Sequence, residues 1–266
     1  MEKIKELREK TGAGMVDCKK ALDEAGGDMD KAVELLRKKG IAKAAKRGER
    51  DTSEGVVKLA VSKDSSEGYI LELNSETDFV ARNEKFQEFA DKTIEIIKTK
   101  KPSDLNVLLS TAMDNGATVG ENLDTLSGVI GEKLVIKRFD VLSSVGTVAG
   151  YSHLGGRIGV LVSLSSKGSE TLAGDVAMQI AAVNPSYIAP EEVPSEETDK
   201  EKEIYRAQLL KEGKPENIVE KILEGKINKY YEDVCLTKQE FIKDDKKKIC
   251  DILGDIKVEK FIRYSL

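Results

Sequence analysis

Residues 54–74, EGVVKLAVSKDSSEGYILELN, carry the main signal for the fold of this chain. Apolar and polar residues alternate over 54–61 and again over 68–74, and the SKDSSEG between them is typical of a turn. The pattern predicts two antiparallel strands joined as a hairpin. A second stretch, VGTVAGYSHLGGRIGVLVSLS at residues 145–165, repeats this pattern around LGG. The sequence therefore contains a duplicated β-hairpin.

The segments that follow the two hairpins extend the duplication. Each hairpin precedes a helical pattern, and each unit then closes on a helix and a third strand with the similar endings IGEKLVIKRF and LGDIKVEKFIRY. The sequence thus predicts an α+β fold with a duplicated core of three-stranded antiparallel sheets and helices. We place the N-subdomain of this core at 54–143 and the C-subdomain at 144–185 and 238–266.

The second unit carries an insertion. From Gly146 to Gly254 there are 108 positions, whereas the equivalent step from Gly55 to Gly131 takes 76. The excess falls at residues 186–237, which are rich in charge and have apolar residues at helical spacing. EGKPEN divides this segment, so we expect an antiparallel helical hairpin. It would serve either as a structural arm or as an oligomerisation or docking arm.

Two residues are expected to mark the helices of this hairpin. Ser195 is the expected cap of the first helix, because a serine side chain accepts a hydrogen bond from a free N–H group. Pro215 is expected in the first turn of the second helix, where the missing N–H of proline costs nothing.

Residues 1–40 predict a module of three short helices, because three apolar stripes are each followed by glycine. Val16 belongs to the second stripe. Asp28 is the expected N-cap of the third helix, and Gly40 is its expected end. Residues 41–53 are basic and poor in large apolar side chains, which favours a solvated linker, partly helical at most, over a nucleic-acid contact.

The composition argues against several classes of function. A net charge of −5 is unlike that of a protein whose main task is to bind phosphate backbones. The apolar runs are far shorter than a membrane span, and the charged N-terminus is unlike a signal peptide. The three cysteines, Cys18, Cys235 and Cys250, show no CxxC spacing. We expect a cytoplasmic protein with reduced thiols and with neither a membrane nor a nucleic-acid partner.

Few residues offer covalent chemistry. The single histidine, His153, follows a predicted strand at a turn, where a solvated residue is the ordinary expectation. One histidine and scattered cysteines cannot build a zinc cluster. TGAG at residues 11–14 suits a helix–helix turn as well as an anion-binding loop. The sequence predicts no cofactor and no metal of its own.

A group of carboxylates offers the one chemical alternative. Four acidic residues surround the end of the second strand: Glu72, Glu76, Asp78 and Glu84. Such a group could hold a divalent cation in a metal-assisted hydrolase. Because carboxylates also complement the N-terminus of a helix, we favour helix capping over catalysis.

Phe79 stands out in the polar segment NSETDFVARNEKF, residues 74–86. Asp78 before it and Arg82 after it predict a short turn ahead of a helix that begins near Asn83. Phe79 and Phe86 are seven positions apart, or two helical turns, so both could face the core. On residue chemistry alone we favour core packing of Phe79 over exposure.

Three motifs together are similar to those of bacterial elongation factor Ts: LREKTGAGMVDCKKAL at 7–22, TDFVARN at 77–83 and RIGVLVSL at 157–164. The resemblance runs in order along the chain and includes the duplicated core and the inserted hairpin. It implies that residues 1–40 are a UBA-like (ubiquitin-associated) module. It also implies a guanine nucleotide exchange factor for elongation factor Tu, which is not an enzyme of covalent chemistry. A UBA-like adaptor or scaffold is the alternative.

The resemblance further implies contacts with this partner. One segment matches the part of the family that disturbs the partner's Mg²⁺ site, with its aromatic residue entering the GTPase surface: Thr77, Asp78, Phe79 and Val80. Other residues match further contacts with the GTPase: Arg8, Met15, Val16, Ile130, Gly131 and His153. The helical hairpin leaves open a homodimer or a two-plus-two complex with the partner.

Overall fold

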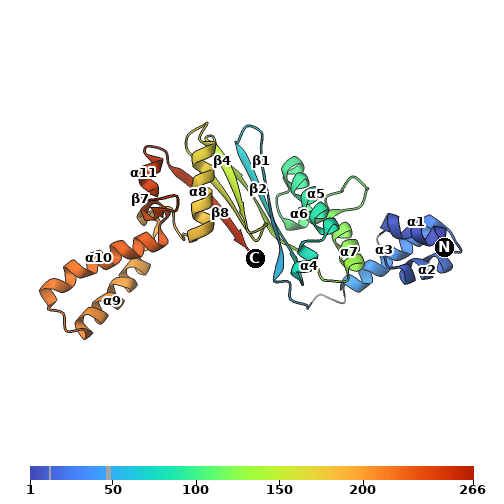
Figure 1. Cartoon of the computed structure of the whole chain (residues 1–266), viewed down its shortest axis with the longest axis horizontal. Helices are drawn as coiled ribbons and strands as arrows, with labels where there is room; N and C mark the ends of the chain where they lie inside the picture. The colour runs from blue at the N-terminus through green and yellow to red at the C-terminus, as the bar shows by residue number, and fades with distance from the viewer. Residues whose placement is uncertain (12, 46–48) are drawn as a thin grey trace.

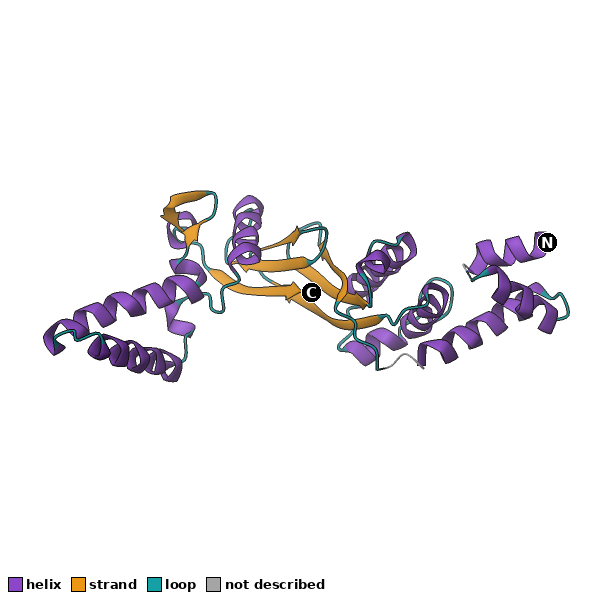
Figure 2. Cartoon of the chain, turned by 60° about the horizontal axis from the view of Figure 1, so that its bottom comes forward, coloured by secondary structure: helices purple, strands orange, loops and turns teal. Residues whose placement is uncertain are grey.

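The computed structural model describes residues 1–11, 13–45 and 49–266. The molecule is elongated, with a group of three helices at one end, two sheets in the middle and a helical hairpin at the other end (Figure 1). Figure 2 shows the strands gathered at the centre and helices toward both ends. The predicted α+β class is confirmed. Gly12 of TGAG and residues 46–48 of the expected linker lie outside the described residues.

The N-terminal module consists of α1 (Glu2–Thr11), α2 (Met15–Glu24) and α3 (Met29–Ala45). Its small core is formed by side chains from all three helices: Leu7, Cys18, Ala21, Leu22 and Ala32. Asp28 caps α3 as expected, because its Oδ1 accepts a hydrogen bond from the Lys31 N–H at 3.1 Å. Val16 is 67% exposed, so its expected place in the apolar stripe is wrong. It lies two positions before the buried Cys18, which on a helix is nearly the opposite side.

The prediction that Gly40 ends the third helix is wrong, because α3 continues to Ala45. The glycine has another role: it lies against Gly128 of α7 (Val119–Ile130). A Cβ atom on Gly128 would be only 2.5 Å from the Gly40 Cα. The two glycines therefore allow α3 and α7 to cross in close contact, which joins the module to the core.

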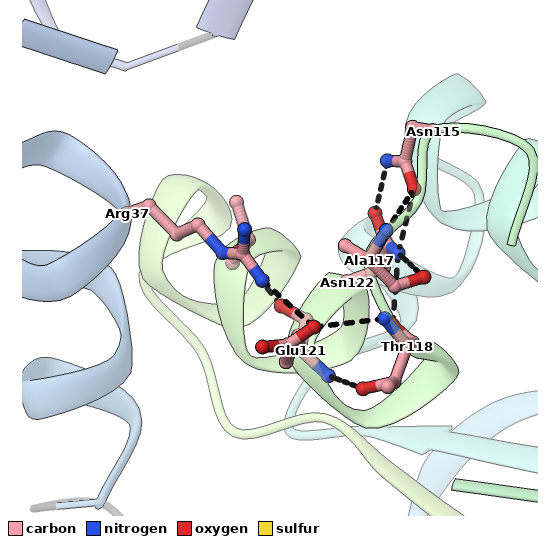
Figure 3. A network of polar contacts seen from close by, with 7 residues as sticks. Arg37, Asn115, Ala117, Thr118, Glu121 and Asn122 are labelled. Carbon is pink, nitrogen blue, oxygen red and sulfur yellow. Dashed lines mark hydrogen bonds and ion pairs between the residues drawn. The ribbon is translucent and has the colours of Figure 1, made fainter. Parts of the chain in front are cut away.

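An ion pair supports the same joint (Figure 3). Arg37 of α3 contacts the Glu121 carboxylate at 2.7 Å. Glu121 also accepts a hydrogen bond from the Thr118 N–H at 2.8 Å, and the Thr118 hydroxyl accepts one from the Glu121 N–H at 3.1 Å. This capping box fixes the first turn of α7 and holds Glu121 toward Arg37.

The first sheet has the antiparallel order β1 (Glu54–Val61), β2 (Glu67–Ser75), β3 (Val135–Ser143). Alternation in β2 buries both faces, since Leu71 and Leu73 face the helices while Ile70 faces the second sheet. The helices that pack on this sheet are α5 (Glu84–Lys100), α6 (Leu105–Ser110) and α7.

The second sheet repeats this order with β4 (Thr147–His153), β5 (Ile158–Leu164) and β8 (Val258–Ser265). Helix α8 (Glu170–Val183) covers its outer face, so the core has helix, sheet, sheet and helix layers (Figure 1). Apolar side chains of both sheets meet at the centre: Val57, Ile70, Leu142, Val148 and Leu161. The duplicated three-stranded core is thus confirmed.

The insertion forms the expected hairpin of α9 (Ser195–Lys211) and α10 (Glu216–Val234), flanked by the 3-10 turns η1 (Pro190–Glu192) and η2 (Leu236–Lys238). Ser195 makes no capping hydrogen bond and is the first residue of α9, after the N-cap Pro194, so that prediction is wrong. Pro215 is the N-cap of α10 and lies just before its first turn.

One small element was missed in the sequence. A hairpin of β6 (Glu240–Phe241) and β7 (Asp244–Lys248) precedes α11 (Ile249–Leu253). Its strands are too short and too charged to show apolar alternation. Across the described residues, none of the helices is long and apolar enough to cross a membrane.

Candidate functional site

Phe79 lies on a four-residue helix, α4 (Asp78–Ala81), directly after β2. Val80 and Ala81 are buried against the core of the first sheet, whereas Phe79 is 80% exposed. The expected core packing of Phe79 is therefore wrong. Phe79 and Phe86 do not face the same side as two residues two turns apart on one helix would. Helix α4 ends after one turn, and a separate helix, α5, begins after the N-cap Asn83.

The start of α4 is fixed by Thr77. The Thr77 hydroxyl accepts a hydrogen bond from the Val80 N–H at 3.4 Å, which makes Thr77 the N-cap of the helix. Asp78 is in the first turn, where its charge suits the helix N-terminus, and it pairs with Arg82 at 2.7 Å. The aromatic ring is thus carried on a short, capped helix and not on an open loop.

The loop between α7 and β3 lies beside Thr77. Ile130 ends α7, and Gly131 adopts a left-handed conformation with φ 93°. Glu132 accepts hydrogen bonds from the Thr77 N–H at 3.0 Å and from the Thr77 hydroxyl at 2.8 Å. Glu76 in turn accepts from the Lys133 N–H at 2.6 Å. The structure therefore brings Thr77–Val80 together with Ile130 and Gly131.

The turn after His153 reaches the same edge of the first sheet. The Val57 N–H donates to the Gly156 carbonyl at 2.6 Å, and Arg157 pairs with Glu54. Glu54 is opposite Ser75, the last residue of β2. The hydrogen bond to Glu54 raises the pKa of Arg157, and the Asp78 carboxylate adds to this rise. This turn and α4 therefore share one end of the core.

His153 itself is exposed and is held by a neighbour. The Tyr151 hydroxyl is 3.1 Å from its Nδ1, and the two rings stack with their centroids 5.9 Å apart. Neither contact involves a carboxylate or a nucleophile, so the pair orients an aromatic surface and does not form a catalytic triad.

Arg8, Met15 and Val16 are separate from this group, on the N-terminal module. Arg8 and Val16 are exposed and Met15 is half-buried. Arg8 and Met15 line a hollow of about 450 Å³ whose far wall includes Lys85, at the start of α5. The hollow therefore lies between the N-terminal module and the start of α5 in the core.

The four acidic residues do not form a metal site. Glu72 is fully buried between Lys137 at 2.8 Å and Arg138 at 2.7 Å, and Glu76 contacts Arg50 at 3.1 Å. Asp78 and Glu84 lie in the first turns of α4 and α5. The capping prediction is right for the last two and wrong for Glu72 and Glu76. Within the described chain no three potential ligands gather around a common point.

Comparison with known proteins identifies the family to which this chain belongs. The family model "Elongation factor TS" matches residues 76–266. An elongation factor Ts of Clostridium perfringens is 47% identical over 275 residues, which cover 98% of this chain and 91% of that protein. The chain belongs to the elongation factor Ts family. A second elongation factor Ts, of Nitratiruptor sp., is 48% identical over 279 residues and covers 99% of this chain and 91% of its own length.

Membership in the elongation factor Ts family confirms the resemblance found in the sequence. It makes the protein a factor of translation elongation. The family match begins at Glu76 and so includes α4, the α7–β3 loop and the His153 turn. The N-terminal module lies before this match but inside the alignments with both relatives.

Sequence reasoning missed the residues that hold this site together. Glu132 and the pair of Glu54 and Arg157 were not singled out, because charged residues on turns and at strand ends are usually solvated. The one available signal was position, since Glu132 directly follows Gly131. Its partner Thr77 is 55 residues away in the chain, so no local pattern could indicate the contact.

Proposed function

We propose that the protein is a guanine nucleotide exchange factor that binds elongation factor Tu in the cytoplasm. In this proposal it promotes GDP release by disturbing the Mg²⁺ and phosphate site of the GTPase. The observation that carries the proposal is the exposure of Phe79 on the capped helix α4. A large aromatic ring that its own core does not bury is suited to enter another protein.

The energetics of such an insertion are favourable. Transfer of a phenylalanine side chain from water into an apolar site is worth about 1.5–3 kcal/mol. We propose that the ring displaces the GTPase side chains that order Mg²⁺ and its waters. Because the metal bridges the nucleotide phosphates and the protein, its loss removes a large electrostatic contribution to nucleotide affinity.

Thermodynamic linkage limits what the factor can do. If it weakens nucleotide binding by some factor, the nucleotide weakens its binding to the GTPase equally. A thousandfold effect corresponds to about 4 kcal/mol of coupling. One inserted aromatic ring and several packed contacts can supply this amount. Rebinding of nucleotide and Mg²⁺ then releases the factor, so it accelerates exchange without selecting GTP or GDP.

The remaining contacts would hold the GTPase in its altered state. Ile130 and Gly131 adjoin α4 and would approach the nucleotide-binding side, with His153 contacting the GTPase domain from the neighbouring turn. Arg8, Met15 and Val16 would bind the same domain from the N-terminal module, across the hollow beside Lys85.

The α9–α10 hairpin would be an oligomerisation arm. It exposes Ile204, Leu210 and Ile218 among the charged side chains on the outer surface of α9 and α10. These apolar residues would support a homodimer or a two-plus-two complex with the partner, and the hairpin's distance from α4 would leave the exchange surface accessible (Figure 1).

The test is the release of fluorescent GDP from elongation factor Tu, measured by stopped flow with the wild type and Phe79→Ala. We expect the variant to lower the stimulated release rate by about 30-fold or more, which is the effect of removing an interface residue worth 2 kcal/mol. Val145→Ala is the matched control, because Val145 is 82% exposed in the connection between β3 and β4.

Two outcomes would contradict the proposal. A folded Phe79→Ala variant that stimulates release as well as the wild type would show that the ring is not the inserted group. Binding of the wild type to elongation factor Tu with no change in GDP release would favour a UBA-like adaptor instead.

A further inference from the structure

Glu132 contacts the helix that carries Phe79 through both of its carboxylate oxygens. One oxygen accepts from the Thr77 N–H at 3.0 Å and the other from the Thr77 hydroxyl at 2.8 Å. We propose that Glu132 is a positioning residue that holds α4, and with it Phe79, at the angle needed for insertion. This inference rests on the proposed exchange function.

Thr77 transmits the contact to α4. Its hydroxyl donates to Glu132 and accepts from the Val80 N–H at 3.4 Å, so the first bond orients the hydroxyl for the second. Phe79 is only two residues further along the chain. A helix of four residues has too few internal hydrogen bonds to fix its own orientation, so its apolar anchoring by Val80 and Ala81 and its polar contacts at Thr77 together set its angle.

The bonds around Glu132 run in both directions between the two segments. The Lys133 N–H donates to Glu76 at 2.6 Å, while the Ser127 hydroxyl donates to the Glu132 carbonyl at 2.6 Å. On the other side, the Ser75 hydroxyl donates to the Thr77 carbonyl at 2.9 Å. The Thr77–Glu132 and Lys133–Glu76 bonds cross between the two segments, whereas the Ser127 and Ser75 bonds lie within one segment each. The crossing bonds join the start of α4 to the loop that follows Gly131.

A carboxylate is the group that this position requires. Thr77 presents two donors, and an ionised carboxylate offers two acceptor oxygens and no donor. A glutamine has one acceptor oxygen and no charge: with that oxygen on the Thr77 N–H, its amide N–H would meet the Thr77 hydroxyl, which would then have to accept instead of donate. Bonds to a charged acceptor are also about twice as strong as neutral ones.

The fold itself does not depend on the contact between Glu132 and Thr77. Strands β2 and β3 are already paired up to Asn74 and Val135, immediately beside the two segments. Val80 and Ala81 anchor α4 to the core by apolar packing. We therefore expect Glu132→Gln and Glu132→Ala to fold with melting temperatures close to that of the wild type.

The first measurement uses the protein without its partner. Amide hydrogen exchange at Thr77, followed by NMR, should be about tenfold faster in Glu132→Gln and Glu132→Ala, the effect of losing one hydrogen bond to a charged acceptor. Glu95→Gln is the matched control, because Glu95 is a carboxylate on α5 that pairs with Lys98 at 3.1 Å. Unchanged Thr77 exchange would overturn the inference whatever the activity.

The second measurement is GDP release in two backgrounds. Glu132→Gln should lower the stimulated rate about tenfold in the wild type and less than twofold when Phe79→Ala is already present, because the two residues act through one contact. Equal losses in both backgrounds would overturn the inference, since Glu132 would then act independently of Phe79.

The two proposals fail differently. If Phe79→Ala slows GDP release and Glu132→Gln does not, the positioning role is wrong and the exchange function stands. If Phe79→Ala has no effect on release, the insertion mechanism is wrong and the positioning role fails with it, even where Thr77 exchange shows that the contact exists.

Discussion

Phe79 and Phe86 are two phenylalanines close together in the chain that lie in different environments. Both follow a carboxylate-rich segment and both lie near the start of a helix. Phe86 is fully buried under the first sheet, whereas Phe79 is exposed because Val80 and Ala81 take the core positions of α4. Because the two residues are chemically identical, their location alone makes Phe86 a core residue that stabilises the fold and leaves Phe79 available for contact with another protein.

This difference predicts opposite responses to truncation. Phe79→Ala should leave the free energy of unfolding within about 0.5 kcal/mol of the wild type, as expected for an exposed site. Phe86→Ala should lower it by about 3–5 kcal/mol, because the change opens a cavity in the core. Urea unfolding followed by circular dichroism measures both. A loss above about 1 kcal/mol for Phe79→Ala would mean that the ring supports its own fold.

At the scale of elements, the joint between α3 and α7 depends on two glycines. Gly40 and Gly128 allow the helix backbones to touch, and the Arg37–Glu121 ion pair lies across the same crossing (Figure 3). Because the contact is between backbones, neither helix can relax by a side-chain rotation. The joint orients the module that carries Arg8, Met15 and Val16 relative to α4.

The joint predicts that the same substitution has opposite effects at two helical glycines. Gly128→Ala should lower the free energy of unfolding by about 1–3 kcal/mol through overpacking against Gly40. Gly174→Ala on α8 should raise it by about 0.5–1 kcal/mol, because nothing lies within 4 Å of the added methyl group and alanine favours the helix. Thermal and urea unfolding measure both. Equal effects at the two sites would contradict the close crossing.

At the scale of the whole molecule, the two sheets are joined by apolar packing and a buried polar group. The Arg138 guanidinium lies 4.0 Å from the centre of the Tyr264 ring, and the Tyr264 hydroxyl donates to Asp140 at 2.6 Å. Arg138 also pairs with the buried Glu72. The C-terminal strand is thereby attached to the first sheet, which holds the two halves of the duplication in one core.

Buried acids of high pKa predict that the whole fold loses stability in alkali. Burial, with the hydrogen bond to Glu67, raises the pKa of Tyr69 to about 12, and burial raises the pKa of Cys235 to about 11. Burial and Asp140 raise the pKa of Tyr264 as well. Because unfolding lets these groups lose protons at their ordinary pKa values near 9 and 10, deprotonation favours the unfolded chain.

The stabilising contribution of these groups is fully present below about pH 9 and is lost as the pH rises toward 12. Urea unfolding at several pH values between 8 and 11 measures this loss. Tyr264→Phe should reduce the slope above pH 10, since one of the titrating groups is gone. A free energy of unfolding that stays constant over this range would contradict the raised pKa values.

Much of the architecture could be predicted before the structure, because it follows from local patterns. The alternation in residues 54–74 and 145–165 depends on which side of a strand each side chain faces, and the pairing of the first two strands in each sheet follows from a short hairpin connection. The inserted α9–α10 hairpin was likewise visible in its periodicity. Helix ends were less certain, as Gly40 and Ser195 show.

The sequence proposed residues for the candidate site but could not give their geometry. The family motifs point to Phe79, Ile130 and His153, but they do not say that these residues gather at one end of the core. Residue chemistry even favoured burial of Phe79. That error arose because helical spacing was carried across the break between α4 and α5.

The six strands of the duplicated core, the duplication, the insertion and the family of this protein can be established from the order of its amino acids, since each depends on neighbours or on motifs. The exposure of Phe79, the bonds of Glu132 to Thr77 and the contact of Gly40 with Gly128 require the folded chain. The last two join residues from distant segments of the chain. The first depends on which side chains of α4 pack against the core. Such contacts arise from tertiary packing, and a local sequence pattern does not contain information about residues far away in the chain.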